Sequence, residues 1–159
     1  LVGLVWLWMA KRKIEPNTVI KFGLAFVFLA GGFWVFYYTQ FFASEFGKTS
    51  LGVFTFGWLV ITFGELCLSP IGMSAMTKLS PQKTQAVIMG MWFLASAYGQ
   101  YFAGLLGANI AEASANATNL EKLIVYADGY KQLAIYALVA GLVLIIISPF
   151  VKKLMQGVK

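Results

Sequence analysis

Glu65 is the residue whose type and position point most directly to chemistry. It is the only charged residue between Thr49 and Thr77, in a strongly apolar stretch that is long enough to cross a membrane. A charged side chain at mid-membrane costs about 2.5–3.5 kcal/mol on insertion scales, so such residues usually face a cavity or a partner and mark an ion, proton or substrate path. The other two interpretations are a structural ion pair with another helix and a protonated carboxyl without a role.

A stripe of side chains extends from Glu65 along the same stretch. Their spacing of i, i+4, i+7, i+11 and i+14 places them on one face of a helix. The members of this stripe are Trp58, Thr62, Glu65, Ser69 and Gly72. Because this is the only polar face of the helix, we expect it to point into the helical bundle.

Pro70 follows the stripe residue Ser69 and predicts a kink, because a proline inside a helix frees a backbone carbonyl. In transporters, helices that are interrupted at mid-depth often line the binding site. The alternative is a kink that serves helix packing alone.

Two features mark the next apolar stretch. Trp92 and Ser96 lie one turn apart on nearly the same side, with Trp92 well inside the stretch, where it either lines a pocket or packs against lipid or the core. Small residues also recur every four positions and predict a ridge that lets helices approach closely. The ridge consists of Gly99, Ala103, Gly107 and Ala111.

The composition excludes a soluble domain. Of the 159 residues, 60% are hydrophobic and 11% are charged, whereas soluble domains have about 45–50% and about 25%. Nucleic-acid binders and disordered tails are excluded as well, because both need dense charge. Histidine is absent and Cys67 is the single cysteine, so histidine relays, histidine or cysteine metal sites and internal disulfides are excluded. The sequence therefore predicts an all-α integral membrane protein, a helical bundle.

The gaps between charged residues predict four full membrane spans. Leu1–Ala10 is apolar but too short to cross a membrane, and we interpret it as the end of a fifth span. The expected helices therefore cover residues of about 1–10, 20–43, 50–76, 85–111 and 131–152. With a span cut at its start, the chain is expected to be the C-terminal piece of a longer protein.

The basic residues predict the orientation of these spans. Nine of the twelve lie in the loop Lys11–Lys21, the loop Lys78–Lys83 and the tail Lys152–Lys159. Since cytoplasmic loops carry an excess of lysine and arginine, these segments and the C-terminus are expected in the cytoplasm.

Several motifs together resemble one family. The segments Gly64–Ser74, Thr77–Pro81 and Met89–Leu94, with Gly104 and the run Lys21–Leu24, resemble the proton-dependent oligopeptide transporters of the major facilitator superfamily. The resemblance covers the whole chain, as the end of helix eight through helix twelve, roughly the last third of a transporter. The short outer loop 43–50 resembles bacterial members, which implies a bacterial cytoplasmic (inner) membrane.

The resemblance implies roles for four residues. Glu65 corresponds to the glutamate that meets the α-amino group of the substrate and takes part in proton coupling. Trp92 and Ser96 correspond to pocket residues, and Met73 to an apolar residue near the cytoplasmic gate. The proton is the coupling ion, and no cofactor or metal is implied. The implied partners are a di- or tripeptide, protons, the lipid bilayer and the missing N-terminal half of the transporter, with no nucleic acid.

The expected function is proton-coupled symport of di- and tripeptides by alternating access. This chain alone is not expected to transport, because alternating access needs both halves of the transporter. The alternatives are a major-facilitator transporter of another small substrate and a non-transporting structural membrane subunit. An enzyme is not expected, because histidine, a Gly-x-Ser-x-Gly motif and paired intramembrane aspartates are all absent.

The orientation can be tested by cysteine labelling. A membrane-impermeant thiol reagent is expected to reach Ser80→Cys from the cytoplasmic side and Glu121→Cys from the outside, because of the nine-to-three distribution of basic residues. Labelling of Ser80→Cys from the outside alone would reverse the predicted topology.

Overall fold

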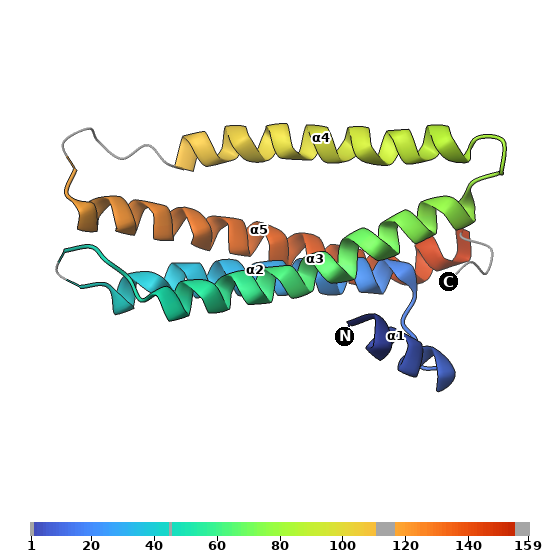
Figure 1. Ribbon diagram of the computed structural model, residues 1–159, viewed down its shortest axis with the longest axis horizontal. Helices are drawn as coiled ribbons and strands as arrows, with labels where there is room; N and C mark the ends of the chain where they lie inside the picture. Colours follow the sequence, from blue (N-terminus) through green and yellow to red (C-terminus); the bar gives the residue numbers. More distant parts are fainter. Residues whose placement is uncertain (1, 45, 111–116, 155–159) are drawn as a thin grey trace.

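The computed structural model describes residues 2–44, 46–110 and 117–154, and this part of the chain is helical throughout, with short connections. Its helices are α1 (Val2–Lys11), α2 (Thr18–Tyr38), the short 3-10 helix η1 (Thr39–Phe42), α3 (Leu51–Leu79), α4 (Gln85–Ile110) and α5 (Asn119–Leu154). The four long helices run side by side, and α1 lies at an angle beside one end of them (Figure 1). The ridge residue Ala111 and the basic Lys159 lie outside the described residues.

Three of the described helices are long and apolar enough to cross a membrane. They are Thr18–Phe42, which joins α2 and η1, together with α3 and α5. The fourth predicted span corresponds to α4, which is 26 residues long and uncharged but less apolar than the other three. Gln85, Gln100, one serine, two tyrosines and four glycines lower its hydropathy. By length and hydropathy, three of the four expected full spans could cross a membrane, and α4 is not among these three.

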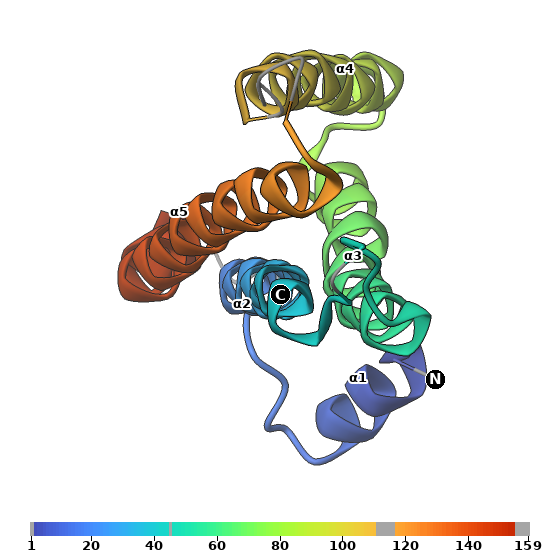
Figure 2. The same ribbon diagram turned by 90° about the vertical axis from the view of Figure 1, so that its left-hand side faces the viewer.

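α2 lies between α3 and α5 when the bundle is viewed end-on (Figure 2). Glycines make the contact between α2 and α3 very close. An ideal Cβ at Gly64 would lie 2.9 Å from the carbonyl oxygen of Ala25, and one at Gly32 would lie 2.3 Å from Cγ1 of Ile61. Since real Cβ contacts are essentially never shorter than 3.0 Å, α2 and α3 approach at a distance that only glycine permits.

The contact between α2 and α5 follows the same rule and adds a polar link. An ideal Cβ at Gly23 would lie 3.1 Å from the carbonyl oxygen of Gly141, and one at Gly141 would lie 3.0 Å from that of Gly23. Nearby, Asn17 caps the start of α2 by accepting a hydrogen bond from the Ile20 amide. Its amide nitrogen also donates to the hydroxyl of Ser148 in α5 at 2.7 Å, and Ser148 is only 1% exposed.

An aromatic cluster joins the same three helices near their other end. Phe36 of α2 is 3% exposed and contacts rings on both neighbouring helices. The ring centroids lie 5.0 Å from Phe54 and 6.0 Å from Trp58 in α3, and 5.1 Å from Tyr130 in α5. Glycine contacts, one polar link and this cluster therefore hold α2, α3 and α5 together along their length.

α5 begins at Asn119, whereas the sequence predicts a helix only from about residue 131. The early start has a local cause. Thr118 and Glu121 form a reciprocal cap, in which the Thr118 amide donates to Oε2 of Glu121 at 2.7 Å and the Glu121 amide donates to the Thr118 hydroxyl at 3.3 Å. Gly47, with a φ of 71°, lies against the backbone of Asn119 and so places the α2–α3 connection beside the start of α5.

The ridge predicted on α4 has no close helix partner within the described part of the chain. An ideal Cβ at Gly99 or Gly107 would meet nothing within 4 Å. The small residues permit a close approach, but none of the other described helices makes one there.

We predict that Gly64→Ala lowers the free energy of unfolding by about 1–3 kcal/mol, because the added methyl meets the α2 backbone, which cannot rotate away as a side chain can. Thermal unfolding in detergent would measure the effect. The matched control is Gly31→Ala, whose Cβ would lie 3.6 Å from Cγ1 of Val60, an ordinary contact. Equal melting temperatures for the two variants would contradict the close α2–α3 contact.

Candidate functional site

Glu65 lies at the centre of α3, and its side chain is exposed in this chain. It lines a pocket of about 110 Å³ between α2 and α3, together with Ala25, Phe26, Leu29, Gly64 and Leu68. Within residues 2–44, 46–110 and 117–154, no hydrogen-bond or ion-pair partner faces its carboxylate. The described residues therefore hold no structural ion pair at Glu65, and the carboxylate is available to a partner from elsewhere.

The stripe that extends from Glu65 does not point into the bundle of this chain, which corrects the expectation from the sequence. Trp58 is 52% exposed, Thr62, Glu65 and Ser69 are exposed as well, and only Gly72 is buried. The buried face of α3 is instead the one that carries Gly57, Ile61, Gly64, Cys67 and Ala75. The reason is steric, because α3 turns small side chains toward α2 and so leaves its polar stripe on the flank of the helix beside that contact, where Glu65 lines the pocket between α2 and α3.

Pro70 lies inside α3, which continues on both sides of it from Leu51 to Leu79. Figure 1 shows the C-terminal part of α3 turning toward α4. A proline is one of the few ordinary causes of such a bend. The bend brings the last turns of α3 next to the first turns of α4.

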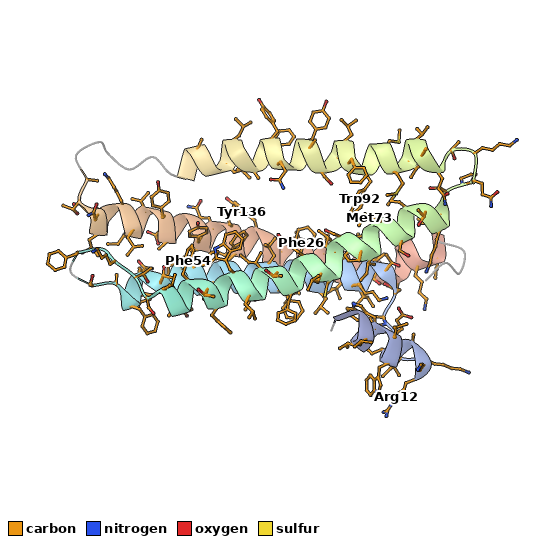
Figure 3. The ribbon with its side chains drawn as sticks, viewed as in Figure 1. Arg12, Phe26, Phe54, Met73, Trp92 and Tyr136 are labelled. Carbon is orange, nitrogen blue, oxygen red and sulfur yellow. The ribbon has the colours of Figure 1, made fainter. Side chains whose placement is uncertain are left out.

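At this crossing, Trp92 of α4 packs on Gly72 of α3. An ideal Cβ at Gly72 would lie 2.2 Å from Cη2 of Trp92, so the indole occupies the space where a side chain would be. Met73, the next residue of α3, is 36% exposed, and Figure 3 shows Trp92 extending toward this part of α3. Trp92 and Met73 are therefore near neighbours.

Ser96 and Glu65 are placed apart from this contact. Ser96 is exposed one turn beyond Trp92, and its hydroxyl donates to the Trp92 carbonyl at 3.0 Å. Glu65 lies two turns before Gly72 in α3, about 10 Å along the helix axis at 1.5 Å per residue. The four predicted site residues therefore lie on α3 and α4. Trp92 is a neighbour of Met73 across the two helices and of Ser96 within α4, whereas Glu65 lies apart from these three.

A second charged site lies at the start of α2, where the sequence indicated only a cytoplasmic basic residue. Lys21 is 6% exposed and forms an ion pair with Glu15. Its Nζ lies 5.0 Å from the ring centroid of Trp6 in α1, and the buried Trp6 Nε1 has no hydrogen-bond partner among the described atoms. The sequence does contain a signal for this ion pair, since Glu15 is the only acidic residue in the three segments assigned to the cytoplasm.

This second site joins three helices. It surrounds a pocket of about 190 Å³, whose lining includes Thr18 and Lys21 from α2, Trp6 from α1, and Pro70 and Ser74 from α3. The ion pair therefore ties the connection before α2 to the first turn of α2, beside a pocket that α3 borders with Pro70 and Ser74.

Comparisons with known proteins agree with this architecture. Residues 2–124 match the family model described as PTR2, POT family. The peptide transporter YePEPT of Yersinia enterocolitica is 38% identical over 112 residues, which are 66% of this chain and 21% of that protein. Dipeptide and tripeptide permease A of Chromobacterium violaceum is 33% identical over 155 residues, 97% of this chain and 30% of the permease. A crystal structure of tetrameric PepTSo2 superposes with a TM-score of 0.73 at 27% identity, over 96% of this chain and 29% of that one.

The fold and these matches define a multi-pass membrane protein of a transporter class, not an enzyme. The chain belongs to the POT family, the proton-dependent oligopeptide transporters. It spans about 20–30% of the length of the relatives it matches.

We predict that Glu15→Gln lowers the free energy of unfolding by about 3 kcal/mol, because it leaves the buried ammonium of Lys21 without a counter-charge. Thermal unfolding in detergent would measure this loss. Adding Lys21→Met to Glu15→Gln should recover most of the stability, since an apolar side chain needs no partner there. If the double variant is as unstable as Glu15→Gln, the cost comes from somewhere other than the unpaired charge.

Proposed function

We propose that this chain is the C-terminal part of a proton-coupled symporter of di- and tripeptides that works by alternating access. In this proposal α1 is the end of helix eight, and α2, α3, α4 and α5 are helices nine to twelve of a major-facilitator fold. Membership of the POT family supports the assignment, and so do the names of two relatives, a peptide transporter and a dipeptide and tripeptide permease.

The observation that carries the proposal is the position of Glu65. A carboxylate at the centre of an apolar helix is costly, and it is normally matched by a partner or used for transport. Here the described residues supply no partner, and the exposed Glu65 lies at the edge of the packed α2–α3 contact, where it lines a pocket between these helices. In the proposed mechanism Glu65 binds the peptide α-amino group in one state and a proton in another, which couples the two movements.

The pocket is proposed to continue from Glu65 toward α4. Trp92 and Ser96 would line it, and Met73, beside the Trp92 contact, would act at the cytoplasmic gate. The N-terminal half of the transporter would face the exposed stripe of α3. This explains why a polar surface is left uncovered here.

The proposed orientation places Lys78–Lys83 and the end of α5 in the cytoplasm of a bacterial inner membrane. Figure 1 supports placing three segments on the same side of the membrane. The α1–α2 connection, the α3–α4 connection and the end of α5 lie at the same end of the bundle. These are the segments that carry most of the basic residues.

We predict that Glu65→Gln in the full-length transporter abolishes proton-driven dipeptide accumulation and leaves stability unchanged or slightly higher. Glutamine keeps the size but cannot ionise, and losing a charge-assisted contact weakens peptide binding by about 1.5–3 kcal/mol, roughly ten- to a hundredfold. Uptake of labelled dipeptide under a pH gradient and thermal unfolding in detergent would be measured together.

Asp128→Asn is the matched control for this experiment, because it removes a carboxylate that is exposed near the other end of the bundle. It should leave uptake intact. A structural role for Glu65 gives the reverse pattern, with an unstable Glu65→Gln variant whose surviving fraction still accumulates dipeptide, and that result would end the transport proposal.

A further inference from the structure

Gly72 of α3 receives the far edge of the Trp92 ring. An ideal Cβ at Gly72 would lie 2.2 Å from Cη2, 2.7 Å from Cζ2 and 2.9 Å from Cζ3 of Trp92. These three atoms form the outer edge of the six-membered ring, so the indole enters edge-first and fills a notch in α3. Gly72 is the one buried member of the Glu65 stripe, and it is buried at this contact.

α4 has few other attachments in the described part of the chain. Met91 and Phe93, on either side of Trp92, are 63% and 60% exposed, whereas Trp92 is half-buried. The side-chain amide of Gln85 donates to the Thr77 carbonyl at 3.0 Å and ties the start of α4 to α3. The rotation of α4 against α3 is therefore set largely where the indole enters the notch.

We propose that Gly72 is a positioning residue of the substrate pocket, which fixes where the Trp92 indole stands relative to Glu65. The inference rests on the proposed function, in which Glu65 binds the peptide α-amino group and Trp92 lines the pocket. Gly72 lies about 10 Å beyond Glu65 along α3, and an extended peptide covers about 3.3–3.6 Å per residue. The indole thus forms a wall at the distance reached by the second or third residue of a peptide.

A methyl group at Gly72 would displace the Trp92 indole. The ring would have to retreat by about 1.3 Å, because carbon atoms in contact prefer a separation of about 3.5 Å. Phenylalanine at position 92 lacks the Cζ2–Cη2–Cζ3 edge and leaves room for the methyl. The effect of Gly72→Ala therefore depends on whether Trp92 is present.

The test is dialanine transport kinetics in the full-length protein. Gly72→Ala is expected to raise KM about fivefold while kcat changes less than about twofold, because the ground-state site is distorted and the transport cycle is kept. In a Trp92→Phe background, Gly72→Ala should raise KM by less than about twofold. Gly52→Ala, also on α3 but with its nearest neighbour 3.7 Å from the ideal Cβ, should leave KM unchanged.

An unchanged KM in Gly72→Ala, or an equal increase in both backgrounds, would overturn the proposal. If Gly72→Ala does not fold alone, the comparison of Trp92→Phe with Trp92→Phe/Gly72→Ala decides: equal KM values support the proposal, and a raised KM in the double variant rejects it.

Fluorine NMR separates this inference from the proposed function. 4-Fluorotryptophan carries its fluorine outside the inserted edge, and the Trp92 signal is assigned by its loss in Trp92→Phe. Gly72→Ala should shift this signal and Gly52→Ala should not. An unshifted signal would overturn the positioning contact, whereas a parent protein that takes up no peptide would overturn the proposed function.

Discussion

The close approach of α2 to both α3 and α5 is the constraint on which the rest of the structure depends. Gly64 faces the Ala25 carbonyl at a distance that leaves no room for a side chain, and Gly23 and Gly141 face each other's carbonyls at distances tighter than most real Cβ contacts. In lipid, apolar burial gives little preference for a neighbouring helix, so van der Waals contact at small residues is a main source of association. Once these faces of α3 and α5 pack against α2, the rotation of each helix about its axis is fixed. The directions of its other side chains follow from that rotation.

The exposure of Glu65 follows from that constraint. Because α3 presents Gly57 and Gly64 to α2, the stripe that contains Glu65 is rotated away from the contact. A carboxylate in the packed face would have to be matched inside this chain, and α2 offers no cation there, since its one lysine is paired with Glu15. The same rotation of α3 brings Gly72 to the edge where α4 crosses. The way α3 packs against α2 therefore also determines which residues line the proposed pocket.

The sequence predicts those features that depend on one segment alone. The isolated charge of Glu65 and the small residues of α4 are visible without a fold, and so are the apolar stretches that become helices. The burial of Lys21 is not visible, because it depends on Trp6 and Glu15 folding back over the start of α2. The orientation of the stripe fails for a related reason. Helical spacing shows which residues share a face, but not which face the neighbouring helix takes.

The contact between α2 and α5 joins parts of the chain that are made at different times. Asn17 and Ser148, which share a hydrogen bond, are 131 residues apart. At a synthesis rate of about 5–20 residues per second, Ser148 is added roughly 7–26 s after Asn17. Throughout that interval the Gly23 side of α2 is without its final neighbour. The face of α2 around Gly23 therefore lacks its packing partner until α5 has been synthesised.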